Sequence, residues 1–328
     1  MAKMIKLIVT GDVNLMHVTD GHVPFRRVKE TLLSADLVFA NLECCLSARF
    51  NEGSTHVEGF FADPDVSATA LTESGIAAVG LANNVNYGAE AITESIGNLD
   101  RIGVAHTGAG GNDTEARAPA VVVRGGQGIA FLQRSSVYWA TNHEATAHSA
   151  GIAVIRGHTA YQVPMYKMKP EIPPLNRPGI PPYIVTWADR DYLARFENDL
   201  VSAREASGLV VASFHWGLHK DVLDYMKEIA HRAIDAGADV VVGHGPHCPL
   251  GIEVYKGKPI FYGLGCFSFH TGHGGIKHEN WVGMMAELSF DRTRLQRAAF
   301  EFVRHNEATA PCRKKKPNSP TSRSGAEN

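Results

Sequence analysis

The chain alternates short apolar segments with amphipathic segments of helical period, and this pattern constrains its fold more than any other feature. Strands are expected at 6–10, 36–40, 77–81, 129–132, 209–214, 239–242 and 259–262. Helices are expected at 66–74, 89–101 and 227–236. Strands joined by helices pair in parallel, so the pattern predicts an α/β layered fold. Ligands of such folds bind beyond the carboxyl ends of the strands, which makes the polar residues there the candidates for function.

Composition narrows the class of protein. The chain has 328 residues, 44% of them hydrophobic and 20% charged, which is enough to bury a sizeable core. We expect one domain over 1–305 and a disordered basic tail over 306–328, a segment rich in Ser, Pro and Lys. The predicted domain has 27 Lys and Arg against 32 Asp and Glu, and this acidic balance excludes nucleic acid as the expected main partner.

Location follows from what the sequence lacks. No apolar run reaches the length of a membrane span, and the first residues are too few and too strand-like for a signal peptide. Five cysteines without a CxxC pair fit a reducing compartment. We therefore expect a cytoplasmic protein with no membrane partner, and the sequence leaves its oligomeric state open.

One segment, 140–183, breaks the regular pattern. Seven of the sixteen prolines fall between Pro164 and Pro182, and aromatic and Met side chains surround them. A long irregular segment inside a compact domain is often a functional lid. We predict a Pro-rich lid-like insertion that holds an apolar peptide; plain packing on the domain is the alternative.

Metal-ligand residue types follow five of the expected strands. They are Asp12, Glu43, the pair Asn83–Asn84, His215, and the pair His244 and His247. Each alone could cap a helix or close a turn. Together, carboxylates, an amide oxygen and imidazoles are the groups that bind a divalent cation, and the oxygen-rich set favours a six-coordinate ion over structural zinc.

Histidines are unusually frequent, and two groups of them lie at strand ends. Gly243–His247 reads GHGPH after three valines, so a tight turn can aim His244 and His247 at one centre. His215 ends another strand, and His219 follows four residues later. These are stronger candidates than His17, His22 and the loop around 270–278, which are expected to be solvated.

Motifs in order from 5 to 269 resemble the CapA-like family of poly-γ-glutamate capsule synthesis, within the calcineurin-like metallophosphoesterase superfamily. They are TGDVNL, FANLE, GLANN, GVAHTGAG, FHWG, GADVVVGHGPH and GIEVYKGKPIFYGLGCFSF. The resemblance implies a four-layer sandwich of two β-sheets flanked by helices, with a metal site at the strand ends. The ligands it implies are Asp12, Glu43, Asn84, His215, His244 and His247.

Departures from the family pattern bear on the reaction. Val85 stands where the family has a histidine after LANN, and Asn86 replaces an aspartate. Asn14 occupies the place of a second ligand near Asp12, and Cys266 replaces an asparagine. A valine cannot stabilise a leaving oxygen, so phosphoester hydrolysis is disfavoured. One metal ion is expected instead of two.

A single cation beside several imidazoles suits removal and return of a Cα proton. The chain resembles lasso-peptide epimerases, which implies an isomerase that inverts the C-terminal residue, tryptophan, of a ribosomally made precursor peptide. Ca²⁺ is the expected ion, with Mn²⁺ or Mg²⁺ as alternatives. The acid and base groups are expected among Asp12, His56, His215, His244 and His247.

Two other functions stay open. One is a CapA-like metal-dependent hydrolase of phosphoesters or γ-glutamyl polymers, and the other is a binding protein that has lost catalysis. A cysteine mechanism is disfavoured, because the adjacent Cys44 and Cys45 point to opposite faces of a strand.

Overall fold

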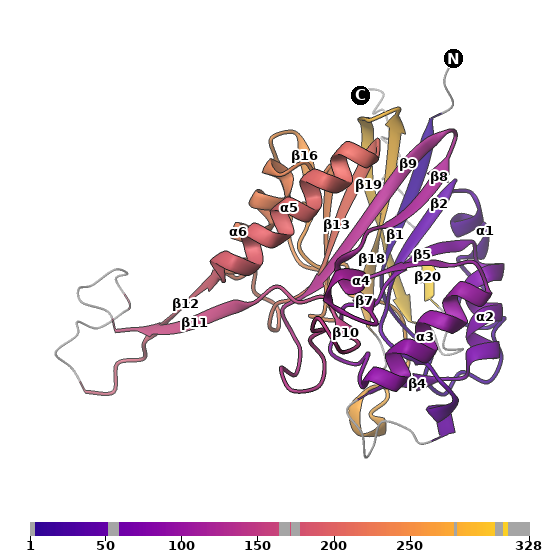
Figure 1. The fold of residues 1–328 in the computed structure, drawn as a ribbon, viewed down its shortest axis with the longest axis horizontal. Helices are drawn as coiled ribbons and strands as arrows, with labels where there is room; N and C mark the ends of the chain where they lie inside the picture. Colours follow the sequence, from indigo (N-terminus) through magenta and orange to yellow (C-terminus); the bar gives the residue numbers. More distant parts are fainter. Residues whose placement is uncertain are drawn as a thin grey trace, which may run out of the picture.

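The computed structural model describes residues 4–51, 59–163, 171, 178–278, 281–305 and 311–313. Two large β-sheets lie face to face at its centre, and helices cover their outer faces (Figure 1). The predicted four-layer α/β sandwich is confirmed. Among the described residues, no helix is both long and apolar enough to cross a membrane.

The first sheet has eight strands. Its path is β20 (Pro311–Arg313), β19 (Arg294–His305), β18 (Val282–Asp291), β1 (Ile5–Asn14), β2 (Leu37–Leu42), β5 (Ile76–Gly80) and β6 (Ala105–Thr107), and β17 (Cys266–Phe269) also pairs with β1. The segment β1–β2–β5–β6 is parallel, as the strand and helix alternation predicts. The long β18–β19 hairpin is antiparallel and was not expected.

The second sheet has six strands. Its order is β15 (Ile252–Tyr255), β16 (Lys258–Phe261), β14 (Val240–His244), β13 (Leu209–His215), β9 (Gln127–Ser135) and β8 (Ala120–Arg124). The central strands β9, β13, β14 and β16 are parallel, so they end at one edge of the sheet. The apolar inner faces of both sheets form the middle of the core, where the Phe39 and Phe131 rings stack 4.6 Å apart.

Helices bury apolar faces on the outer side of each sheet. α1 (Lys29–Leu33), α2 (Pro64–Glu73) and α3 (Ala89–Arg101) cover the first sheet, while α5 (Arg190–Ala206) and α6 (Asp224–Asp235) cover the second. The Asp63 carboxylate caps α2, which has Pro64 in its first turn, and Asp189 caps α5. Asp63 lies at the start of the helix that the sequence predicts at 66–74. The sequence pattern does not predict α5.

Short elements complete the fold. They are β3 (Cys45–Leu46) with β4 (Phe61–Ala62), β7 (Ala109–Gly110) with β10 (Gly151–Ile152), α4 (Asp113–Arg117), η1 (Ala48–Asn51) and η2 (His273–Gly275). Strand β20 lies inside the segment 306–328 that was expected to be disordered. Its three residues pair with β19, and the disorder expected of the segment stays a prediction, because 306–310 and 314–328 lie outside the described residues.

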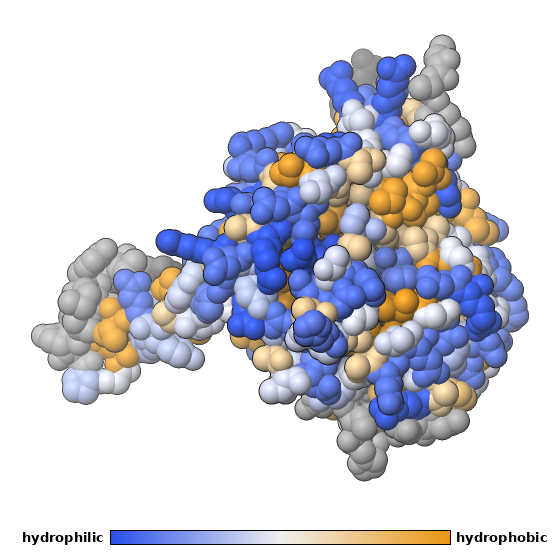
Figure 2. Space-filling model, viewed as in Figure 1, coloured by the Kyte–Doolittle hydropathy of each residue, from blue (hydrophilic) through white to orange (hydrophobic). Residues whose placement is uncertain are grey.

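The Pro-rich segment 140–183 has two described parts. Residues up to β10 pack on the domain, and β11 (Gly157–Gln162) pairs with β12 (Tyr183–Ala188) in a hairpin arm that extends away from the domain (Figure 1). Hydrophobic side chains, orange in Figure 2, lie on this arm. Exposed side chains of its two strands include Ile184 at 63% and the aromatic Tyr161 at 72%. The lid role stays a prediction, because 164–170 and 172–177 lie outside the described residues.

His143, in the first part of this segment, gives a pH prediction. It is fully buried, and its Nδ1 accepts a hydrogen bond from the Trp139 amide at 3.2 Å. Burial lowers its pKa from 6.5 to about 4. Between these two pKa values His143 is protonated in the unfolded chain but stays neutral in the folded protein. The free energy of unfolding therefore decreases as pH falls from about 6.5 to 4.

We expect His143→Gln to reduce this pH-dependent loss of unfolding free energy by at most about 3 kcal/mol, which is the free energy that corresponds to the lowered pKa of His143. Urea unfolding of both proteins at several pH values measures it. Equal pH slopes in the two proteins would contradict the assignment. His148→Gln, at an exposed histidine of the same segment, is the matched control.

Candidate metal centre

The candidate site lies where the carboxyl ends of strands from both sheets meet. In the first sheet, Asp12 on β1 lies in register with Asn41 on β2 and with Cys266 on β17. In the second sheet, His215 on β13 lies in register with His244 on β14. The parallel strands place their polar ends at one edge, so residues far apart in the sequence come together.

The Asp12 carboxylate is at the centre of this group and is fully buried. Its Oδ1 atom is 3.4 Å from His244 Nδ1 and accepts a hydrogen bond from Asn41 Nδ2 at 2.9 Å. Its Oδ2 atom is 3.1 Å from His247 Nδ1. One carboxylate thus contacts two imidazoles and an amide.

Glu43 is the second buried carboxylate of the site. Its Oε1 atom is 3.6 Å from His247 Nε2, and its Oε2 atom accepts a hydrogen bond from Asn41 Nδ2 at 3.3 Å. Asn41 therefore holds both carboxylates with one amide group. His247 touches both through its two ring nitrogens, and its backbone φ of 55° is a strained conformation for a non-glycine residue.

Several buried polar atoms of the site have no hydrogen-bond partner among the described residues. They are Asp12 Oδ2, His215 Nδ1, and both ring nitrogens of His244. Buried polar groups in proteins are nearly always satisfied, so such a group of free ligand atoms requires an explanation. A bound cation supplies one. Ligand atoms of Asp12, Glu43 and His215 lie within 4.8 Å of one another, as do those of Asp12, His247 and Cys266.

Electrostatics at the site also suit a cation. Burial and the Asp12 charge raise the pKa of Glu43 well above its usual range. Burial opposes ionisation of Asp12 as well, but the close imidazoles of His244 and His247 lower its pKa below its usual range. Burial lowers the pKa of His215 to about 3, which keeps it in the neutral form that binds metals.

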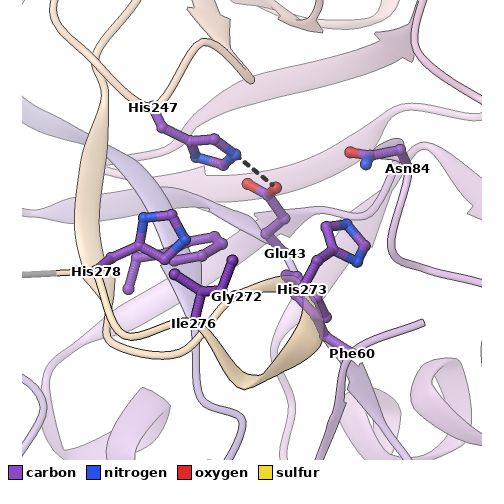
Figure 3. Close-up of a pocket in the computed structure, with 9 residues that line it drawn as sticks. Glu43, Phe60, Asn84, His247, Gly272, His273, Ile276 and His278 are labelled. Atoms are coloured by element: carbon purple, nitrogen blue, oxygen red, sulfur yellow. Dashed lines mark ion pairs between the residues drawn. The ribbon is translucent and has the colours of Figure 1, made fainter. Parts of the chain in front are cut away.

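The site opens into a cavity of about 260 Å³ (Figure 3). Glu43, Asn84 and His247 line one side, and the loop that carries His273 and His278 lines the other. Apolar walls come from Phe60, Phe269 and Ile276. No Lys or Arg is among the described residues that line this cavity, and neither is any residue of the segment 140–183.

The predicted ligands divide into three groups. Asp12, Glu43, His215, His244 and His247 come together, and Asn84 joins them at the cavity wall. Asn83 does not reach the cavity: its amide donates to the Leu42 carbonyl at 2.9 Å and holds the loop. His56 lies outside the described residues, and His219 is exposed.

Two departures from the family motif are structural. Val85 is fully buried in the core cluster behind the first sheet and does not line the cavity. Asn86 donates hydrogen bonds to the carbonyls of Leu81 and Leu42 and fixes the same loop. Neither Val85 nor Asn86 therefore places a polar group at the cavity in the role of the family's histidine.

His273, His278 and Cys266 are the residues whose place the sequence did not indicate. The two histidines were expected to be solvated. His273 is exposed and His278 is half-buried, and both also line the cavity. Their ring contacts explain the position: His273 packs 4.6 Å from Phe60, and His278 packs 5.2 Å from Phe269. A signal was present in the alternation of His with Gly in this loop, but Gly-rich histidine loops are common on surfaces.

The amide of Asn41 leads to a prediction. It bridges Asp12 and Glu43, and its Oδ1 accepts a hydrogen bond from Gln133 Nε2 at 3.0 Å. We expect Asn41→Ala to weaken divalent-metal binding about 10- to 100-fold, as loss of a residue that orients ligands does. Calorimetric titration measures the affinity. Asn98→Ala, at a partly buried amide on α3, is the control, and an unchanged affinity in Asn41→Ala would refute the bridging role.

Comparison with known proteins gives the family. The model of the bacterial capsule synthesis protein family, PGA_cap, matches residues 6–271. The chain belongs to the PGA_cap family. This confirms the CapA-like assignment made from the sequence motifs.

Relatives and a solved structure agree with the assignment. The chain is 28% identical over 303 residues to a probable polyglutamine synthesis accessory protein of Mycobacterium tuberculosis, covering 81% of this chain and 69% of the relative. It is 26% identical over 252 residues to the PGA biosynthesis protein CapA of Bacillus subtilis, covering 76% and 57%. The chain spans about two thirds or less of the length of its curated relatives.

A crystal structure of a hypothetical protein from Thermus thermophilus has the same fold. It aligns with a TM-score of 0.52 over 92% of this chain and 99% of that chain, at 16% identity. The comparison supports the sandwich architecture alone.

Proposed function

We propose that this PGA_cap protein is a metal-dependent peptide epimerase. Its substrate would be a ribosomally made lasso-peptide precursor, and the inverted centre would be the Cα of the C-terminal residue, tryptophan. The observation that carries the proposal is the buried group of carboxylates and imidazoles with free ligand atoms at the end of a small cavity. The peptide substrate is carried over from the resemblance to lasso-peptide epimerases inferred from the sequence motifs, and it belongs to the proposal.

The metal would be one divalent ion, with Ca²⁺ as the first choice and Mn²⁺ or Mg²⁺ as alternatives. Its ligands would be Asp12, Glu43, Asn84, His215, His244 and His247, and the unpartnered atoms of Asp12, His215 and His244 fit this role. When bound, the ion would stabilise the negative charge that develops on the carboxylate of the substrate as its Cα proton leaves.

Side chains of the protein would move the proton. His247 lies at the cavity wall with Nδ1 held by Asp12 and Nε2 facing Glu43. A carboxylate at Nδ1 fixes the tautomer and raises the basicity of the imidazole, so His247 is suited to take or return a proton at Nε2 while that nitrogen is not bound to the ion. His56 stays a proposed partner outside the described residues.

The cavity wall matches a substrate that ends in an aromatic side chain. Phe60 and Phe269 face a space of about 260 Å³, and Ile276 adds an aliphatic surface. Apolar walls with a few polar groups at one end are typical of small-ligand sites. The polar end is the metal centre, which would receive the C-terminal carboxylate.

Deuterium exchange tests the proposal. The protein is incubated in deuterated water with a peptide ending in L-tryptophan, with Ca²⁺, Mn²⁺ or Mg²⁺ added after dialysis against a chelator. We expect deuterium at the terminal Cα and formation of the D-epimer, both lost without metal. Absence of deuterium with every ion would reject epimerisation.

A second function is favoured by the names of the relatives. The Mycobacterium relative is named for polyglutamine synthesis and the Bacillus relative for PGA biosynthesis, which supports a glutamyl polymer as substrate. The corresponding activity would be a CapA-like metal-dependent hydrolase of γ-glutamyl polymers or phosphoesters. Turnover of an aryl phosphate or a γ-glutamyl peptide that disappears in Asp12→Ala would support it. The core position of Val85 is the observation against phosphoester hydrolysis, because no donor to a leaving oxygen stands there.

A further inference from the structure

We propose that Cys266 is a further ligand of the metal centre. With Asp12 and His247 it would hold a thiophilic divalent ion, Zn²⁺ or Co²⁺, as the alternative to the one Ca²⁺ or Mg²⁺ ion held by the oxygen-rich group. This inference rests on the proposed metal centre and adds a ligand, the Cys266 thiolate. The oxygen-rich group is Asp12, Glu43 and His215. Asp12 belongs to both groups and contributes one carboxylate oxygen to each.

The strand register brings the three ligands together. Cys266 on β17 is the register neighbour of Asp12 on β1, and the Asp12 amide donates to the Gly265 carbonyl at 2.8 Å. His247 follows the end of β14, and its strained backbone places its ring beside both residues. Cys266 Sγ lies 3.7 Å from His247 Nδ1, and His247 Nδ1 lies 3.1 Å from Asp12 Oδ2.

These separations match a tetrahedral centre. Bonds of about 2.0–2.1 Å to nitrogen and oxygen and 2.3 Å to sulfur, at tetrahedral angles, separate nitrogen from oxygen by about 3.4 Å and nitrogen from sulfur by about 3.6 Å. The observed 3.1 and 3.7 Å are each close to these values. These two pairs therefore need little movement to bind one ion, and the ligand atoms of all three residues lie within 4.8 Å of one another.

The environment of the ligands supports the assignment independently of the cysteine. Asp12 is fully buried, and its Oδ2 atom, which faces His247, lacks a hydrogen-bond partner among the described residues. His247 keeps 36% of its side chain exposed and lines the cavity, so a fourth ligand would approach a bound ion from that side. Three protein ligands with an open position are typical of catalytic zinc sites.

The donor set determines which ion is preferred. Calcium and magnesium take oxygen ligands, and a thiolate contributes little to their binding. Thiolate and imidazole together favour zinc and cobalt. The alternative is that the Cys266 thiol only forms a weak hydrogen bond to His247.

Cobalt binding distinguishes coordination of a metal ion by the Cys266 thiolate from a hydrogen bond between the Cys266 thiol and His247. Metal-free protein is titrated with Co²⁺, and the near-ultraviolet thiolate-to-cobalt charge-transfer band is recorded. We expect this band in the unsubstituted protein and in Cys248→Ser, the control at the next cysteine along the chain from His247. We expect no band in Cys266→Ser or in His247→Asn, which keeps Cys266.

Affinity gives a second measurement. We expect Cys266→Ser to weaken Zn²⁺ binding about 100-fold or more, above the loss typical of an outer-shell residue, and to leave Ca²⁺ binding unchanged. Folding of each variant is checked by thermal unfolding. A missing band in the unsubstituted protein, or a band that persists in Cys266→Ser, overturns this inference. Deuterium exchange supported by Ca²⁺ would then still stand, so the two failures are separable.

Discussion

Under the proposed epimerase function, replacing Asp12 with asparagine is expected to reduce deuterium incorporation at the substrate Cα about 100-fold or more, within the range that a positioned acid or base contributes. The reason is that the Asp12 carboxylate contacts three neighbouring side chains at once. Its oxygens lie within 3.4 Å of His244 and His247 and accept a hydrogen bond from Asn41. An asparagine has the same shape but no charge. Its NH₂ group would also replace one of the two oxygens that face Asn41, His244 and His247, and an NH₂ group cannot accept a hydrogen bond from them.

The same substitution is expected to reduce metal binding, because Asp12 belongs to both candidate ligand groups. Deuterium incorporation by mass spectrometry and metal content by elemental analysis measure the two effects. Asp65→Asn, at an exposed carboxylate on α2 paired with Arg101, is the control and should keep full activity. Activity of Asp12→Asn close to that of the unsubstituted protein would remove the basis of the proposed centre.

Replacing Asp199 with asparagine is expected to lower the free energy of unfolding by about 3 to 5 kcal/mol, the cost of leaving a buried charge without its partner. Arg134 on β9 has 1% of its side chain exposed, and its Nη2 lies 2.6 Å from Asp199 Oδ2 on α5. Burial lowers the pKa of Arg134 to about 10 even with this carboxylate beside it. Without Asp199, the guanidinium keeps its desolvation cost and loses its compensation.

Urea unfolding measures this effect as a shift of the midpoint at constant slope. The exposed pair of Asp65 and Arg101 is the matched control, and Asp65→Asn should change stability by no more than about 1 kcal/mol. An equally small change in Asp199→Asn would show that the Arg134 pair is not what joins α5 to the second sheet.

Much of the candidate site was predictable from the sequence because the signal is local. Apolar segments such as 6–10 and 209–214 mark buried strands, and polar residues follow them closely. Parallel strands share one edge, so Asp12, Glu43, His215, His244 and His247 were expected together, and they are.

Other parts of the site depend on pairing between distant segments. Cys266 lies beside Asp12 only because β17, late in the chain, pairs with the first strand β1, and no spacing in the sequence encodes that register. His273 and His278 line the cavity because their loop folds back against Phe60 and Phe269. A Gly-rich loop has no apolar periodicity to indicate which way it folds.

The sequence by itself determined the layered α/β architecture and the polar strand ends, since both follow from the order of apolar and polar residues along single segments. Only the tertiary structure decided which of those ends share a centre, which carboxylate oxygens lack a partner among the described residues, and that Val85 lies in the core. These properties are distances between segments that meet only when both sheets have packed.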